Sequence, residues 1–294
     1  MLTMTVAADR PIKVLLQTTI PFAPDDWHIG RFELLRAYLA ELRDPGGRPL
    51  ADVVARNREP DGERVDPVLS TIDTSDFDQV WLFGVDTGGE TGISKPECKA
   101  LSNFRRSGGA IFSTRDHQDL GSSLCNLGGI GAAHFFHSVN PEPEQDRRHR
   151  DDPYTTAIDF PNYHSGDNGD VQHVVVDATH PVTRDVTTLP AHPHEGAVGA
   201  PQDDPSAHVV VRGTSTATGR PFSIAVAFES QNGEGRGWAE STFHHFCDYN
   251  WDTRRGCPSF VTETPSHALE RDPSLLDDTK RYVRNLLGWL GRRT

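Results

Sequence analysis

A short apolar run that stops abruptly at a group of polar residues is the feature that most constrains the fold of this sequence. A glycine pair at 108–109 leads into the β-prone run 110–113, and a glycine-containing segment that could form a helix follows. Ligands of open α/β sheets bind just beyond the carboxyl ends of strands. We therefore expect a functional site here; the alternative is a polar loop that caps a helix. The polar residues that follow the run are Arg115, Asp116, His117 and Asp119.

Apolar runs alternate with amphipathic segments through the first half of the chain. Residues 12–18 and 79–85 read as buried strands, and residues 52–55 as an edge strand. Apolar side chains at helical spacing predict helices over 30–43 and, after a Ser94/Glu97 capping box, over 94–107. This order predicts a flavodoxin-like α/β/α sandwich with a mostly parallel sheet.

The second half of the chain continues the pattern after a polar excursion. Residues 140–170 are polar but contain aromatic residues, so we expect an ordered lid over the active face; a flexible surface insertion is the alternative. A further helix is expected to end at the glycines of 128–131. The remaining predicted elements are strands at 171–177, 208–212, 222–228 and 237–242 and a helix at 275–290.

Composition excludes several classes of protein. The 294 residues suit one domain, expected to span 1–294, and the net charge of -13 argues against a nucleic-acid partner. No run of 18 apolar residues predicts a membrane span, and the first residues lack the apolar core of a signal peptide. The four cysteines form no CxxC pair and read as reduced thiols of a cytoplasmic protein. The glycine-rich segment 86–92 lacks nucleotide-binding spacing, so neither nucleotide nor flavin is expected.

Three polar clusters follow predicted strands and could converge on one end of the sheet. The first is the group after residue 113, the second runs over 192–195, and the third over 244–250. Imidazole and carboxylate ligands together suit Zn, Mn, Fe or Ni. One hypothesis is a divalent metal held by His117, His194 and His244, with Glu195 or Asp116 as a further ligand or general base.

A metal-free site is the other hypothesis. His117 or His244 would then act as acid–base catalyst, oriented by Asp116 or Glu195. Adjacent His244 and His245 on extended backbone would point to opposite faces, so one of them is expected to face the pocket; alternatively the pair packs beneath the last helix. The predicted catalytic residues are Asp116, His117, Glu195 and His245.

Other polar and aromatic residues near these clusters are candidates for substrate contact. Arg115 would grip an anionic or polyhydroxyl substrate. His28, just before the first helix, is either a site residue or a solvated side chain beside an apolar anchor, Trp27. The predicted substrate-binding residues are Trp27, His28, Arg115, Asp119, Tyr163, His164 and Asn250.

Several of these segments, in this order, resemble the trehalose-utilisation (ThuA-like) family of the class I glutamine amidotransferase-like superfamily. The matching segments include the strands at 13–18 and 80–85, the glycine pair with Asp116-His117, and the His-Pro segment at 180–184. The segment 193–195 lies where the family often has an Asp-Glu pair, and 235–245 is similar to its glycine-rich strand that ends near a histidine. The resemblance covers most of the chain except 140–170. It implies the flavodoxin-like fold and a carbohydrate or similar small polar substrate.

One departure from the superfamily pattern limits the chemistry. Amidotransferases carry a nucleophilic cysteine in a G-x-C-x-G turn, where this chain has residues 114–117; Cys125 comes later and reads as a core residue. Without the thiolate, glutamine amidotransferase chemistry is not expected. We therefore predict a hydrolase or lyase with a His/Asp/Glu site. The alternative is a non-catalytic small-molecule-binding or scaffold protein on the same fold. The expected partner is a small molecule, and homodimerisation remains open.

Overall fold

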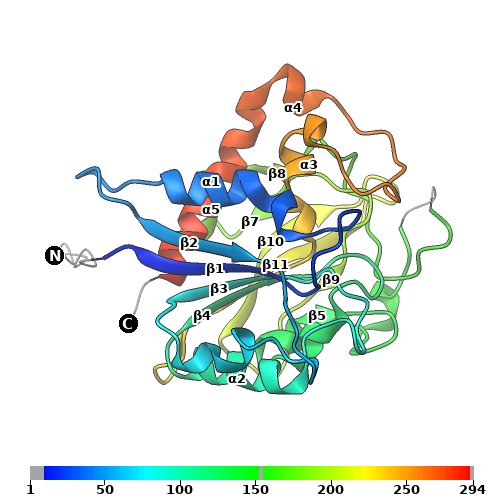
Figure 1. The fold of residues 1–294 in the computed structure, drawn as a ribbon. Helices are drawn as coiled ribbons and strands as arrows, with labels where there is room; N and C mark the ends of the chain where they lie inside the picture. Colours follow the sequence, from blue (N-terminus) through cyan, green and yellow to red (C-terminus); the bar gives the residue numbers. More distant parts are fainter. Residues whose placement is uncertain (1–9, 152–154, 292–294) are drawn as a thin grey trace.

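A central sheet of eight strands, in the order β2-β1-β3-β4-β12-β11-β10-β7, organises the computed structural model, which describes residues 10–151 and 155–291 (Figure 1). The strands from β2 to β12 in this order are parallel, and β11, β10 and β7 are antiparallel. This sheet confirms the predicted α/β class with a mostly parallel sheet. The strands are β1 Ile12–Thr18, β2 Ala51–Arg56, β3 Gln79–Phe83, β4 Ala110–Thr114, β7 Val175–Val176, β10 Ala207–Thr214, β11 Pro221–Phe228 and β12 Gly237–Glu240.

Helices cover both faces of the sheet. Figure 1 shows α1 and α5 on one face and α2 on the other. Two small two-stranded sheets, β5 with β9 and β6 with β8, lie outside the main sheet. Among the described residues, no helix has the length and apolar character needed to span a membrane. These elements are α1 Glu33–Glu41, α2 Lys95–Arg106, α3 Asp248–Trp251, α4 Ala268–Arg271, α5 Asp277–Leu290, β5 His134–Phe135, β6 Val171–His173, β8 Thr188–Pro190 and β9 Ala197–Val198.

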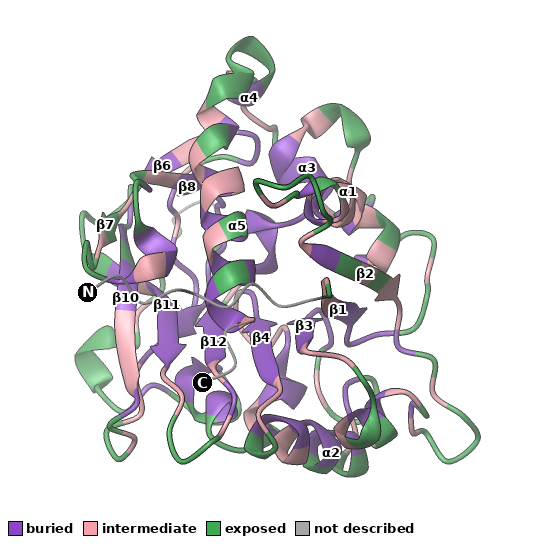
Figure 2. Ribbon diagram, turned by 90° about the vertical axis from the view of Figure 1, so that its left-hand side faces the viewer, coloured by how far each residue is buried: buried purple, intermediate pink, exposed green. Residues whose placement is uncertain are grey.

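Two apolar cores, one on each face, explain why the central strands read as continuous apolar runs. Successive residues of a strand point to opposite faces. In β1, Val14 and Leu16 belong to the core beneath α1 and α5, whereas Leu15 belongs to the core beneath α2. The ribbon coloured by burial shows the same pattern, with buried central strands and exposed outer turns of α2 (Figure 2). Because both faces are covered, the carboxyl edge of the sheet is where a polar site can form.

Three predicted elements differ from the structure in extent. The helix expected over 30–43 begins as a 3-10 turn, Ile29–Phe32, and α1 ends at Glu41. The helix expected after residue 121 is a 3-10 segment, Ser122–Asn126. Gly121, which precedes it, has φ of +86°, and a Cβ there would lie 3.0 Å from the carbonyl oxygen of Gly84, so the chain turns tightly against β3. Residues 171–177 form two short strands in different sheets.

Candidate functional site

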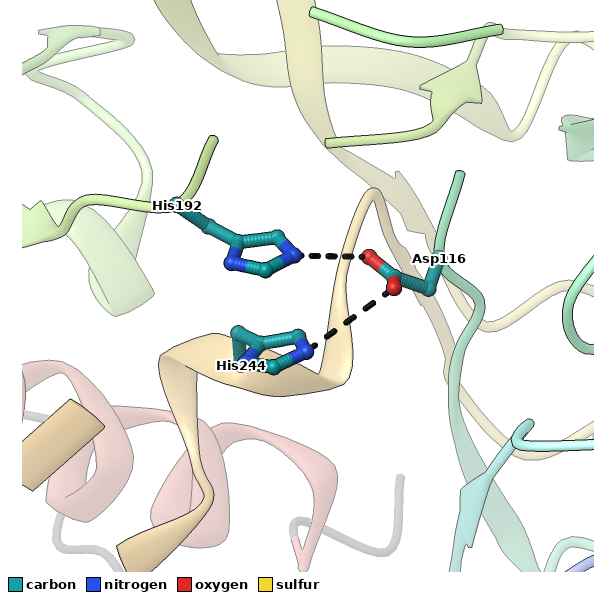
Figure 3. A group of neighbouring side chains, drawn as sticks. All are labelled: Asp116, His192 and His244. Atoms are coloured by element: carbon teal, nitrogen blue, oxygen red, sulfur yellow. Dashed lines mark ion pairs between the residues drawn. The ribbon is translucent and has the colours of Figure 1, made fainter. Parts of the chain in front are cut away.

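Asp116, His192 and His244 form a buried cluster beyond the carboxyl edge of the sheet (Figure 3). One ligand-type atom from each residue lies within 4.8 Å of the other two, and all three residues are buried. His192 Nε2 is 3.5 Å from Asp116 Oδ1, and His244 Nε2 is 3.8 Å from Asp116 Oδ2. The two imidazole rings stack at a centroid separation of 3.5 Å, so both Nε2 atoms face the same carboxylate.

Segments that are distant in the sequence bring these side chains together. Asp116 comes two residues after β4 ends, and His192 comes two residues after β8 ends. His244 lies in the 3-10 turn Phe243–His245 that follows β12. Because β4 and β12 are parallel neighbours, their carboxyl ends place Asp116 beside this turn. The Thr242 hydroxyl donates to Asp116 Oδ1 at 2.8 Å and fixes the carboxylate.

A chain of hydrogen bonds that starts at a backbone carbonyl fixes the tautomers of both histidines. Asn250 Nδ2 donates to the Ala191 carbonyl oxygen at 3.0 Å, so Asn250 Oδ1 must face His244 Nδ1, 2.8 Å away. The same Nδ2 donates at 2.9 Å to Asn168 Oδ1, which also lies 2.9 Å from His192 Nδ1. Each amide oxygen is only an acceptor, so each Nδ1 carries the proton and each Nε2 keeps a lone pair.

The consequence is that two lone pairs face an ionised carboxylate in a dry environment. Burial lowers the pKa of His192 to about 4 and holds the pKa of His244 well below its usual value. Burial alone would raise the pKa of Asp116, but its contacts with the His117 and His192 imidazoles outweigh burial and hold it well below the usual range. His192 Nε2 is a buried atom with no hydrogen-bond donor in reach. Lone pairs of the two imidazoles and the carboxylate repel one another, and a cation bound between the three residues would remove that repulsion.

The cluster opens into a cavity of about 600 Å³ with further histidines in its wall. His117 Nδ1 lies 2.9 Å from Asp116 Oδ2, and His117 is partly exposed. His194 Nε2 lies 3.0 Å from Glu263 Oε1, a contact that lowers the pKa of Glu263 to about 2. The rings of His117 and His194 are 5.4 Å apart. Residues 155 and 158 of the excursion also line the cavity; its residues 152–154 lie outside the described part.

Glu195 and His245, which we expected to be catalytic, lie in a separate buried network. His245 Nδ1 is 2.8 Å from Glu240 Oε1, and its Nε2 is 3.6 Å from Glu195 Oε2. Burial alone would lower the pKa of His245, but the two carboxylates raise it to about 9. Gln172, Ser241, Trp238 and Tyr282 donate to the same carboxylates. Glu195 and His245 do not line the cavity, so the structure separates them from Asp116 and His117, with which we had grouped them.

Three expected substrate contacts have structural roles instead. Arg115 is fully buried; its guanidinium lies over the Phe136 ring and donates to backbone carbonyls, including that of Ala197 at 3.4 Å. Tyr163 stacks on a phenylalanine ring of the core, and His164 Nδ1 contacts the Thr216 hydroxyl. None of the three lines the cavity, because each is held by the chain around it.

Of the other four predicted substrate-binding residues, two line the cavity and two do not. Trp27 and Asp119 line the cavity, and the Trp27 ring lies edge-on to His244 at 4.8 Å. His28 accepts a hydrogen bond from the backbone of Gly30 and caps a 3-10 turn, outside the cavity lining. Asn250 orients His244 from behind and does not reach the cavity. Of the metal ligands predicted from sequence, His244 belongs to the cluster with Asp116 and His192. The other two, His117 and His194, lie in the cavity wall beside that cluster.

A second cluster of possible metal ligands, His180, His208 and Glu229, provides an instructive contrast. His180 Nδ1 accepts a hydrogen bond from the backbone nitrogen of Val182 at 3.3 Å. The neutral ring must then carry its proton on Nε2, which lies 3.6 Å from Glu229 Oε1, so the lone pair of the ring points away from that carboxylate. The guanidinium of Arg236 also lies 3.6 Å from Glu229. The tautomer of His180 and the nearby guanidinium therefore make this cluster less suited to a metal than the first one.

Sequence reasoning did not assign a role to His192, Asn168 or Glu263. The signal for His192 was its place two residues before His194, which belonged to the predicted metal set. Their rings are in fact 5.6 Å apart. Asn168 lies in the polar excursion and Glu263 in the loop before α4, and no local pattern distinguishes either residue from a solvated side chain.

Comparison with known proteins bears on the fold alone. No family model matches the chain, and no curated protein matches it. Among solved structures, cytoplasmic protein STM1381 from Salmonella typhimurium LT2 is similar at 9% identity and a TM-score of 0.52, over 95% of this chain and 100% of that one. Cytoplasmic protein STM3548 from Salmonella typhimurium is similar at 11% identity and 0.50, over 95% and 99%. The glutaminase domain of Trypanosoma brucei CTPS follows at 13% identity and 0.47, over 96% and 98%. The two Salmonella proteins thus show that the chain shares its fold, over 95% of its length, with proteins of low sequence identity.

Proposed function

We propose that this chain is a metal-dependent enzyme of the hydrolase or lyase type that acts on a small polar metabolite, with a divalent cation held by Asp116, His192 and His244. The observation that carries the proposal is the fixed orientation of two imidazole lone pairs toward one buried carboxylate. Two histidines and one carboxylate are a ligand set used by Zn, Mn, Fe and Ni sites.

The hydrogen bonds behind the histidines also fit a metal site. Histidines that bind metals usually donate their other ring N–H to an oxygen that fixes the ring. Asn250 and Asn168 provide such oxygens. A bound divalent ion would supply Lewis-acid polarisation of a substrate oxygen and would lower the pKa of a water molecule.

Residues around the cluster have separate roles in this proposal. His117, beside Asp116 and partly exposed to the cavity, is the candidate general base. His194, held by Glu263, is the candidate acid on the opposite wall. The buried indole of Trp27 packs against His244 and keeps water from its ring.

Thiol chemistry has no support in the described residues. Burial raises the pKa of Cys98 to about 12 and also raises that of Cys247. Cys247 Sγ contacts Asn250 Oδ1 at 3.2 Å, behind His244 and away from the cavity. The ThuA-like sequence features favour a carbohydrate or similar substrate. The names of the two Salmonella proteins favour a cytoplasmic location.

A titration of the metal-free protein with Co²⁺ tests the proposal. We expect one equivalent to bind and to give visible absorption bands typical of nitrogen and oxygen ligands. We also expect hydrolysis or elimination within a panel of glycosides, lactones and polyols to require Co²⁺, Zn²⁺ or Mn²⁺. Binding without turnover would favour a non-catalytic binding protein, and the absence of stoichiometric binding would refute the metal site.

Substituting Asn250 tests the tautomer argument directly. In Asn250→Ala the His244 Nδ1 loses its acceptor and the ring can rotate or exchange tautomers, so we expect metal affinity to fall by about 10- to 100-fold. Calorimetric titration with Zn²⁺ measures the change. Asn285→Ala is the matched control, because Asn285 donates only to carbonyls beside α5 and should leave the affinity unchanged. Equal affinities in the two variants would contradict the role of Asn250.

A further inference from the structure

We propose that the cavity over Asp116 selects a small ligand that carries a positively charged group, an amine or quaternary ammonium, and excludes anions. This inference rests on the proposed function, because it names the charge of the ligand for the same site. It also replaces the expectation that Arg115 grips an anionic substrate.

Four carboxylates line the cavity, and among the described residues two of them, Asp26 and Asp119, form no ion pair with a histidine. Asp26, Asp116, Asp119 and Glu263 line the cavity, and no Lys or Arg is among the described lining residues. Asp26 Oδ1 accepts a hydrogen bond from the backbone of Trp27, and Asp119 Oδ1 accepts one from Ser138. In residues 10–151 and 155–291, neither carboxylate lies within ion-pair distance of a Lys or Arg. Beyond the metal position and the His194–Glu263 pair, an anion would meet the carboxylates of Asp26 and Asp119.

The nearby guanidinium groups are held elsewhere. Arg115 donates to carbonyls beneath the cavity floor, including that of Ala197. Arg31 donates to the carbonyl oxygens of Asp26 and Gly256, with its guanidinium 6.0 Å from the Trp27 ring, and does not line the cavity. Neither side chain is therefore placed to bind a phosphate or carboxylate in the cavity.

The remaining wall combines apolar side chains with threonines and a glutamine, and its apolar part suits an organic cation. Phe260 lines the cavity although its side chain is 58% exposed, so a ring face is open to a ligand. Ammonium groups bind over aromatic faces, and adjacent carboxylates strengthen the binding. The buried Nε2 of His192, which has no hydrogen-bond partner, marks the floor where the metal and the polar end of the ligand would meet.

Three probes on one carbon skeleton test the inference: benzyltrimethylammonium, benzyl alcohol and phenylacetate. The quaternary ammonium has no lone pair and cannot bind a metal, so its binding reports on the acidic wall alone. Calorimetry with chelator-treated protein, in which phenylacetate has no metal ion to bind, should give the order cation, alcohol, anion. In Asp119→Asn, affinity for the cation should fall by at least about fivefold. Glu63→Gln makes the same change in net charge at an exposed residue outside the cavity and should leave it unchanged.

The outcomes separate this inference from the metal proposal. If Zn²⁺ does not bind but the order of the probes persists in metal-free protein, the metal site fails and the charge preference stands. If Zn²⁺ binds but phenylacetate binds the metal-free protein as well as the cation does, the charge preference fails alone. Equal effects of Asp119→Asn and Glu63→Gln would also overturn it, as would the absence of binding by all three probes.

Discussion

His244→Ala is expected to abolish stoichiometric binding of divalent metal, with a loss of affinity of at least about a hundredfold, since the substitution removes a ligand rather than its support. Any metal-dependent turnover should disappear with it. His244 is one of only two imidazoles that face Asp116 with a fixed lone pair. Calorimetric titration of Zn²⁺ into chelator-treated protein measures the affinity, and circular dichroism checks that the variant is folded.

His208→Ala is the matched control for this experiment. His208 belongs to the other cluster of possible ligands, in which the tautomer of His180 is unfavourable for a metal. We expect the control to bind Zn²⁺ as the wild type does. If His208→Ala lost the metal and His244→Ala kept it, the assignment of the site would be wrong, although both clusters contain two histidines and one carboxylate.

His245→Ala is expected to destabilise the protein strongly, lowering the free energy of unfolding by about 3–5 kcal/mol. The imidazole lies fully buried between Glu195 and Glu240, and its removal leaves two carboxylates facing each other without a cation. Urea unfolding of metal-free protein followed by fluorescence measures the effect. The exposed His173→Ala should change the free energy of unfolding by no more than about 0.5 kcal/mol. Similar values for the two variants would show that the network contributes little.

The pH dependence of stability provides a second measurement of the same network. The pKa of His245 is raised to about 9 in the folded chain, whereas an unfolded histidine titrates near 6.5. A raised pKa means that the folded state binds the proton more tightly. The contribution is therefore complete below about pH 6.5 and is lost as the pH rises through 9, an effect of roughly 3 kcal/mol. His245→Ala should lack this decline; a decline equal to that of the wild type would exclude His245 as its source.

The sequence predicts the sheet better than the site. Strands are marked by local runs of apolar residues, whereas the site depends on contacts between residues that are distant in the sequence. Buried strands such as β3 and β11 are recognisable because both faces of the sheet are covered and their residues are almost all apolar. The 3-10 segment after Gly121 was read as a helix because nothing local indicates that Gly84 approaches so closely. Tertiary contact overrode local propensity there.

The structure brings some of the predicted site residues together and separates others, and their functional roles stay predictions. Asp116 and His244 follow strands, and strand ends are visible in the sequence. Glu195 and His245 carry the same chemical groups next to the same strands, yet they face the core. The direction of a side chain in a loop depends on contacts with distant residues, as the bond from Asn168 to His192 shows. Such contacts leave no local pattern.

The spacing of the three cluster residues along the chain has a consequence for biosynthesis. Asp116, His192 and His244 belong to segments that meet only after β12 has joined β4. A ribosome must therefore release most of the polypeptide before the third side chain is in place, and under the metal proposal the ion would be loaded late, after the sheet has closed. Nascent fragments that end before residue 244 should emerge without the capacity to retain the ion.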